Sequence, residues 1–259
     1  MKFTAAFLAP LFLASTTHAL VGISPGYVSK TAGWNLKEIS PLQRVEGETR
    51  HTFSMSDMTR DVVQVAMESP SARPLTTEVN LWLGPDYTPY KLTAHSEDGA
   101  EYPIQVLVGT KKYACNVEIK NAGPYTQSLT AACSYAVPPL ADSTTDIKYE
   151  QATYIEGGAI KVQTFPAEVE ELQVMLTTKG KHLKAKVELL LGPNNIKQEF
   201  DVYASNGEKN PLFLVFETPG AGYAIRVKNL ATVEYPLDMY TRASRTGTAQ
   251  ASAATAQWN

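Results

Sequence analysis

The sequence is poor in the residues that most often carry out chemistry. Its 259 residues include only two cysteines and four histidines. After His18, the histidines are His51, His95 and His182, and none lies two to four residues from another histidine or a cysteine, as zinc ligands commonly do. We therefore expect no metal ion, no cofactor and no histidine-based nucleophilic pair, and we interpret these three histidines as surface residues.

Other signatures of activity are absent as well. There is no Gly-rich phosphate loop and no Gly-x-Ser-x-Gly nucleophile motif. Charged residues make up 19% of the chain, and the formal net charge is −3. Proteins that bind nucleic acids neutralise phosphates with clustered Lys and Arg, and this sequence has no such cluster. We therefore expect neither an enzyme nor a partner made of nucleic acid.

Long apolar runs are missing beyond the first residues. Met1–Ala19 has a basic start, a short apolar run and a small-x-small end, which predicts a secretory signal peptide. The run is too short to cross a bilayer, so we expect no membrane span. Residues 20–37 contain lysines, Ser, Thr and Gly but no acid, which is typical of a transit peptide. A two-part address for a plastid and an ordinary secreted protein with an irregular arm both fit this composition.

A seven-residue stretch occurs twice. It reads Val-Asn-Leu-Trp-Leu-Gly-Pro at Val79–Pro85 and Val-Glu-Leu-Leu-Leu-Gly-Pro at Val187–Pro193. The copies are 108 residues apart (187 minus 79), and the same offset pairs Gly99 with Gly207. Each copy extends over about 85 to 90 residues, which is longer than a solenoid repeat and close to one small domain. The pattern predicts an internal duplication.

The limits of the two copies follow from flanking matches. Upstream, Glu46-Gly47 corresponds to Glu156-Gly157, and downstream Lys120-Asn121 corresponds to Lys228-Asn229. We therefore predict the following segments: repeat 1 at 46–136, a Pro-containing linker at 137–155, repeat 2 at 156–240 and a disordered Ala/Thr/Ser/Gln-rich tail at 241–259.

Short runs of β-branched and leucine residues, separated by Gly, Pro, Asn and Asp, fill both repeats. This spacing predicts an all-β fold of two tandem, pseudo-symmetric antiparallel β-sandwich-like domains. Alternation places Val79, Leu81 and Leu83 on a buried face. The only stretch with a helix-like composition is 168–172, where one short helical turn is compatible with the sequence.

Some apolar residues fall on faces that the alternation assigns to solvent. Trp82 and Leu190 occupy the same position of the repeated stretch. The strand at 211–216 is apolar on both faces, so Phe213 and Val215 need cover from the same chain or from another subunit. We interpret Trp82, Leu190, Phe213 and Val215 as assembly contacts.

The two cysteines, Cys115 and Cys133, both belong to repeat 1. A hairpin joining 113–120 to 126–136 would place them opposite each other. They would then form either a cross-strand disulfide or two half-buried thiols, and both alternatives stand.

The chain resembles the diatom pyrenoid shell proteins. The resemblance rests on two β-rich repeats, each with a Leu-Gly-Pro-Asp/Asn turn at Leu83–Asp86 and Leu191–Asn194, behind the two-part presequence. It implies a non-enzymatic plastid protein of the stroma that assembles with copies of itself into the protein sheet around the Rubisco-filled pyrenoid, supporting CO2 concentration. Rubisco or other pyrenoid components are the implied partners. Leu20 stands where diatom plastid presequences usually carry an aromatic residue.

Two other classes of function compete with this one. A secreted tandem carbohydrate-binding module would use Trp34, Tyr87, Tyr90 and Tyr102 as a stacking platform. An enzyme such as a carbonic anhydrase is the third hypothesis, and it would require bound metal.

Overall fold

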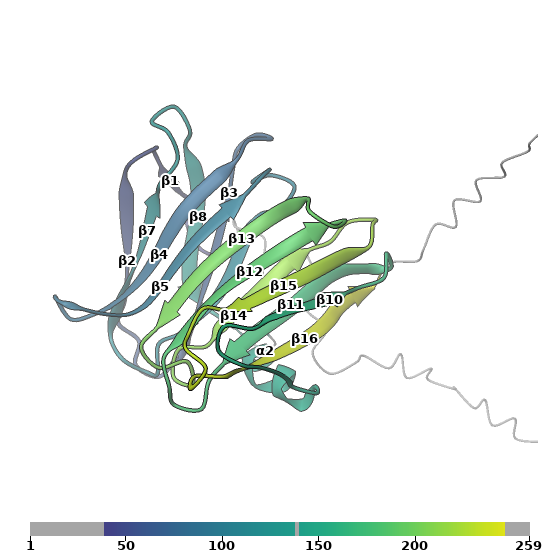
Figure 1. Ribbon diagram of the computed structural model, residues 1–259. Helices are drawn as coiled ribbons and strands as arrows, with labels where there is room; N and C mark the ends of the chain where they lie inside the picture. The colour runs from purple at the N-terminus through teal and green to yellow at the C-terminus, as the bar shows by residue number, and fades with distance from the viewer. Residues whose placement is uncertain (1–38, 138–139, 247–259) are drawn as a thin grey trace, which may run out of the picture.

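Sixteen strands form two stacked antiparallel sheets in the computed structural model, which describes residues 39–137 and 140–246 (Figure 1). Sheet A has the spatial order β1 (Gln43–Val45), β8 (Leu129–Tyr135), β3 (Val62–Glu68), β6 (Ile104–Gly109), β14 (Leu212–Glu217), β11 (Val169–Thr177), β16 (Leu237–Thr246) and β9 (Thr153–Ile155). Sheet B has the order β10 (Ile160–Thr164), β15 (Tyr223–Asn229), β12 (Leu183–Leu191), β13 (Ile196–Ala204), β5 (Tyr87–Ser96), β4 (Leu75–Leu83), β7 (Cys115–Asn121) and β2 (Arg50–Met55).

The all-β, antiparallel, sandwich-like fold predicted from the sequence is therefore confirmed. Each half of the chain contributes four neighbouring strands to each sheet. Strand β6 pairs with β14 in sheet A, and β5 pairs with β13 in sheet B. Both sheets thus continue from one half of the chain into the other, as Figure 1 shows in the middle of the molecule.

The register at these two joins follows the 108-residue offset of the sequence. Val106 of β6 pairs with Leu214 of β14, and Thr93 of β5 pairs with Asp201 of β13. In both pairs the partners are residues that the offset equates. The two halves therefore face each other about a local pseudo-two-fold axis that passes through both sheets at these pairs.

A buried asparagine closes the end of sheet B in the first half. Asn121 is 2% exposed. Its Nδ2 donates to the carbonyl oxygens of Val45 (3.0 Å) and Gln127 (2.8 Å), and its Oδ1 accepts from the N–H of Gly123 (2.9 Å). The side chain thereby ties β7 to a strand of sheet A and to the loop that follows β7.

Asn229 makes the same three bonds in the second half. Its Nδ2 donates to the carbonyl oxygens of Ile155 (3.2 Å) and Tyr235 (2.9 Å), and its Oδ1 accepts from the N–H of Ala231 (3.0 Å). The matching Lys-Asn dipeptides of the sequence therefore occupy matching positions in the fold.

Two further matching residues are glycines next to these asparagine sites. A Cβ at Gly47 would lie 1.9 Å from the carbonyl oxygen of Pro124, and one at Gly157 would lie 1.8 Å from that of Thr232. No side chain fits at such distances, so both positions require glycine for the close approach of two backbones.

The helical content differs from the sequence prediction. Residues 169–172, where a helical turn was expected, belong to strand β11. Helix α2 (Leu140–Asp146) and the 3-10 helix η1 (Ile147–Tyr149) lie in the linker instead. Val169 and Leu172 are buried core residues, and pairing with β14 and β16 outweighs the local preference of the acidic residues around them.

The predicted start of the disordered tail is also wrong. Strand β16 continues to Thr246 and pairs with β11 through Gln173↔Arg242 and Val174↔Thr241. Pairing with β11 holds this segment in the sheet although its sequence lacks apolar periodicity. The rest of the tail, from residue 247, and the whole presequence lie outside the described residues.

Removing either buried asparagine should destabilise the protein. We expect Asn121→Ala and Asn229→Ala each to lower the free energy of unfolding by about 3 kcal/mol, because each deletes three hydrogen bonds of about 1 kcal/mol. Urea unfolding followed by circular dichroism would measure the change. The exposed Asn194→Ala is the matched control and should stay within about 0.5 kcal/mol of wild type. A similar loss in all three variants would show that the two asparagine sites are not structural clamps.

Candidate functional site

Strand β2 leaves the backbone of one edge of sheet B without a partner strand among the described residues. The N–H of Asn121 donates to the carbonyl of Thr49 (2.9 Å). Since bonding alternates along an antiparallel pair, the backbone groups that point away from β7 belong to Arg50, Thr52 and Ser54. Their side chains are exposed and polar.

The opposite edge of sheet B is formed by β10. The N–H of Asn229 donates to the carbonyl of Ala159 (3.0 Å), so the outward backbone groups belong to Ile160, Val162 and Thr164. Ile160 is 57% exposed and Val162 is 49% exposed. This edge therefore presents apolar β-branched side chains, whereas the β2 edge presents polar ones.

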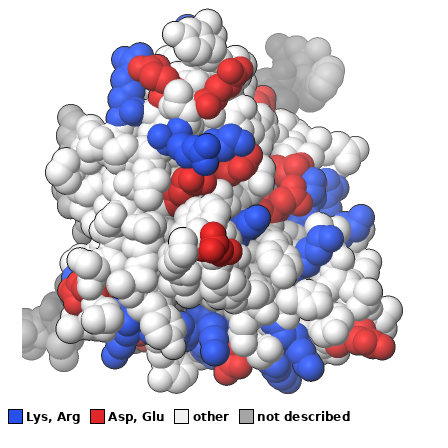
Figure 2. Space-filling view, turned by 90° about the vertical axis from the view of Figure 1, so that its left-hand side faces the viewer, with Lys and Arg blue, Asp and Glu red and all other residues white. Residues whose placement is uncertain are grey.

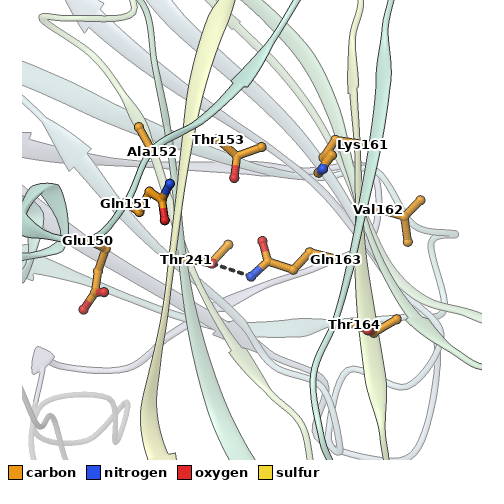
Figure 3. Close-up of a pocket in the computed structure, with 9 residues that line it drawn as sticks. All are labelled: Glu150, Gln151, Ala152, Thr153, Lys161, Val162, Gln163, Thr164 and Thr241. Atoms are coloured by element: carbon orange, nitrogen blue, oxygen red, sulfur yellow. Dashed lines mark hydrogen bonds between the residues drawn. The ribbon is translucent and has the colours of Figure 1, made fainter.

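A cleft of about 590 Å³ opens between the two sheets beside β10 (Figure 3). Gln163 of β10 donates through Nε2 to Oγ1 of Thr241 on β16 (2.9 Å) and so links the two sheets at its floor. Lys161 lies on the same strand as Gln163, and Glu150 lies across the opening. The other lining residues are Gln151, Ala152, Thr153, Val162 and Thr164.

The corresponding edge of the first half has a different residue facing inward. Phe53 of β2 pairs with Val117 of β7, and Gln163 of β10 pairs with Ile225 of β15, so Phe53 and Gln163 occupy matching positions. Phe53 packs against the core and stacks edge-on with His51, with ring centroids 4.7 Å apart. The ring of Phe53 fills the space between the sheets at the β2 edge. The smaller amide of Gln163 leaves that space open at the β10 edge, where the polar cleft lies.

The charges near the β1 and β2 edge are mixed. Figure 2 shows this end of the molecule, where acidic and basic side chains lie interspersed among uncharged surface. Ion pairs Arg50–Glu118 (3.4 Å) and Lys120–Glu78 (2.9 Å) belong to the outer face of sheet B here. This face therefore presents no extended patch of one sign.

The three histidines of the described residues lie apart from one another. His95 shares a hydrogen bond with Thr76 (2.9 Å between Nδ1 and Oγ1), and His182 stacks on Tyr235 at 4.2 Å. His51 contacts Phe53, as described above. Within residues 39–137 and 140–246, no group of three or more His, Cys, Asp or Glu residues has the arrangement of a metal site.

The two residues singled out in the repeated stretch have different surroundings. Trp82 is half-buried on the outer face of sheet B, where it pairs with Asn116 of β7. Leu190 is only 3% exposed, although the alternation predicts an outward position. The alternation itself holds, because the register of β12 with β15 is unbroken at Leu190 and the matching shift against β5 lies beside Trp82. Leu190 keeps its outward position and shares a pocket on that face with Val162 and Arg226. Leu190 is thus not available as a surface contact.

Phe213 and Val215 are covered by their own chain. They are 0% and 1% exposed and belong to a small second core on the outer face of sheet A. Ile147 of the linker is part of this cluster, and Ala141 of α2 packs against it. Of the two sources of cover that the sequence left open, the structure shows the intramolecular one, so neither residue is a surface contact in this conformation.

The two cysteines are free and buried in the core. The predicted hairpin is wrong, because β7 and β8 belong to different sheets. Cys115 and Cys133 therefore do not face each other within one sheet. Burial raises the pKa of the Cys115 thiol to about 11, and burial with the nearby Cys115 also raises the pKa of Cys133.

The aromatic platform expected of a carbohydrate-binding module is not assembled. Tyr90 is 0% exposed, and Tyr102 is 3% exposed with its hydroxyl 3.0 Å from that of Tyr223. Tyr87 is exposed on the surface, and Trp34 lies outside the described residues. The two buried rings cannot stack on a sugar.

Like the cleft beside β10, a second opening was missed by the sequence reasoning. A groove of about 330 Å³ lies at one end of the sandwich and contains two lysines, Lys111 and Lys209, with no carboxylate in its described lining. Tyr87 lies beside it and shares a hydrogen bond with Ser205 (2.9 Å between Oη and Oγ). The sequence signal for this groove is a difference between the repeats, because Asn210 in the groove aligns with the larger Tyr102 in the other copy.

The fold and these surfaces define a class: an all-β sandwich whose described part offers unpaired strand edges and polar openings. No helix in that part is long and apolar enough to cross a membrane. The chain belongs to the diatom pyrenoid shell protein family, whose model matches residues 34–243. Membership places the protein among the structural proteins associated with the plastid pyrenoid.

Other comparisons are distant. No curated protein matches the chain. Among solved structures, the PBSX exported protein XepA is similar at 9% identity and a TM-score of 0.26, covering 76% of this chain and 84% of that chain. The vicilin from Solanum lycopersicum (tomato) is similar at 7% identity and a TM-score of 0.20, covering 78% of this chain and 75% of that chain. At such TM-scores the likeness carries no argument about function.

The raised pKa of Cys115 predicts a pH dependence of stability. Its thiol stays protonated in the folded protein but ionises above about pH 9 when unfolded, so its contribution to stability is complete below pH 9 and is lost as the pH rises toward 11. We expect the difference in unfolding free energy between wild type and Cys115→Ala to shrink over that range in urea titrations. A constant difference would contradict the burial of this thiol.

Proposed function

We propose that this protein assembles with copies of itself into the protein layer that encloses the Rubisco-filled pyrenoid in the plastid stroma. The family match over residues 34–243 carries the proposal. In this role the protein would support CO2 concentration and carbon fixation by its architecture rather than by catalysis, with Rubisco or other pyrenoid components on the enclosed side.

The arrangement of the chain supports such a role. An internal duplication gives one molecule two related halves. Each sheet has two edge strands, one from the first half and one from the second. The two outer edges of sheet B are not alike, since β2 presents polar and β10 apolar side chains. Unlike edges favour contacts between different surfaces of successive copies, and contacts of that kind propagate when they do not close into a ring.

Trp82 is the residue from the repeated stretch that we retain as a contact between copies. It is half-buried on the outer face of sheet B, so part of the indole remains available to a neighbour. Tryptophan is enriched among residues that dominate protein interfaces. Leu190, Phe213 and Val215 are left out because they are buried within the chain.

Electron microscopy of the purified chain from Leu20 onward tests the proposal directly. We expect negatively stained samples to contain ordered sheets or tubes above a threshold concentration, with and without reductant, because the buried thiols make no bond between copies. A monodisperse monomer at every concentration would contradict the structural role.

Two substitutions at matching positions distinguish the surface residue from the buried one. We expect Trp82→Glu to keep the fold but to raise the concentration needed for assembly, because it places a charge in a desolvated contact. Leu190→Glu should instead lower the free energy of unfolding by about 3 kcal/mol or more, since it buries an unpaired carboxylate. Light scattering and urea unfolding would separate the effects. If Trp82→Glu assembles like wild type, Trp82 is not a contact.

A further inference from the structure

Two loops of the molecule share one backbone geometry. The loop from β5 to β6 turns at Asp98, whose Oδ1 accepts from the N–H groups of Ala100 (2.9 Å) and Glu101 (3.1 Å). The N–H of Tyr102 then donates to the carbonyl of Asp98 (2.9 Å). These bonds fix the loop independently of its exposed side chains.

The loop from β13 to β14 has the same bonds. Oδ1 of Asn206 accepts from the N–H groups of Glu208 (3.0 Å) and Lys209 (3.0 Å), and the N–H of Asn210 donates to the carbonyl of Asn206 (2.9 Å). The two loops are related by the 108-residue offset. Because β5 and β13 are antiparallel neighbours, the loops lie at opposite ends of the sandwich.

The charges of the two loops differ although their backbones agree. The first loop carries three acids, Glu97, Asp98 and Glu101. Among the described residues only Glu97 forms an ion pair, with Lys197 at 2.9 Å. The second loop has Ser, Asn and Lys at the corresponding positions 205, 206 and 209, and Glu208 in place of Ala100, so it carries no net charge. We refer to residues 97–101 as the acidic loop.

The groove lies at the end with the second loop, and the space that corresponds to it at the acidic end is filled. At the acidic end, Tyr102 and Tyr223 are each 3% exposed and join through their hydroxyls, which fills the space between the loops. At the other end Asn210 replaces the first tyrosine and donates to the carbonyl of Gly109 (2.7 Å). At the position of the second tyrosine the first half has Cys115, and Tyr113, which lines the groove, is 59% exposed. The exchange of a large ring for an amide leaves the groove open.

The lysines of this groove have no carboxylate in its lining. Lys111 and Lys209 line the opening, and the carboxylate of the neighbouring Glu208 lies near Gly180 instead. A volume of about 330 Å³ holds about ten water molecules, which is room for two or three carboxylate side chains. The groove thus suits an acidic loop of another protein.

We propose that the lysine groove binds the acidic loop of a second copy of this chain. This inference rests on the proposed assembly and gives it a direction, because the two surfaces lie at opposite ends of one molecule. Charge complementarity selects the second copy as the occupant: the same chain carries the basic groove and the acidic loop. A contact between two different surfaces repeats from copy to copy along the strand direction.

Two charge-changing variants test the contact. The first, Glu97→Ser with Asp98→Asn and Glu101→Lys, gives the acidic loop the residues that the same backbone carries at 205, 206 and 209. The second, Lys111→Glu with Lys209→Glu, reverses the charge of the groove. The matched control is Lys179→Glu with Lys181→Glu, which makes the same charge change on exposed lysines of a neighbouring loop outside the groove lining.

We expect each variant alone to form particles only at a concentration at least about tenfold higher than wild type requires. The control should behave like wild type. Mixing the two variants should give heterotypic complexes of at least twice the monomer mass at concentrations where neither variant assembles alone, because the first variant keeps the groove and the second keeps the acidic loop. Mass photometry and sedimentation velocity would measure both results, and circular dichroism would verify that each variant is folded.

The outcomes separate this inference from the proposed function. If wild type forms ordered particles and either variant does so at the same concentration, the groove contact is wrong while the structural role stands. Absence of heterotypic complexes in the mixture also overturns the contact. If a triple or double variant does not fold, the single changes Glu101→Lys and Lys209→Glu replace it. Wild type that stays monomeric overturns the structural role itself.

Discussion

The pairing of β5 with β13 and of β6 with β14 is the contact on which the rest of the structure depends. It joins the two halves through both sheets, so neither half has a core that closes without the other. It also makes the central strand β14 apolar on both faces, with Phe213 and Val215 outward. These outward apolar side chains need to be covered, and Ile147 and Ala141 of the linker pack over them. A connector between repeats has thereby become part of the core.

Period-two alternation and the 108-residue offset were enough to predict the fold class and the matching asparagines, because both depend on local pattern. The offset did not reveal that the halves share sheets, since strand pairing is set by long-range contacts. The outer face assigned to Leu190 is correct, but its burial was not predicted, because cover by neighbouring side chains is a tertiary contact. The cysteines were placed in one hairpin because adjacent strands in sequence usually pair, whereas β7 and β8 cross between the sheets.

Two openings of the surface lie where the two halves differ in one inward-facing residue. Gln163 in place of Phe53 leaves the cleft beside β10, and Asn210 in place of Tyr102 leaves the groove with the lysines. Phe53 and Gln163 lie at opposite edges of sheet B, and Tyr102 and Asn210 lie at opposite ends of the sandwich. In each pair the large ring fills space that the smaller amide leaves open. The residues conserved between the halves, such as Asn121 and Asn229, hold the backbone so that these exchanges do not disturb the fold. A duplicated scaffold can therefore acquire unlike ends with few changes.

Unlike ends and unlike edges together are sufficient to describe a layer. In the proposed assembly, the groove and the acidic loop connect copies along the strands, which produces only a filament. The polar β2 edge and the apolar β10 edge lie at right angles to that direction within sheet B, and they supply a second axis. Lys161, which points between the sheets at the β10 edge, disfavours an extra strand that would continue both sheets. Lateral contact then involves the outer side chains Ile160 and Val162 rather than strand pairing. Neighbouring copies would therefore lie side by side in a flat layer and would not extend each other's sheets.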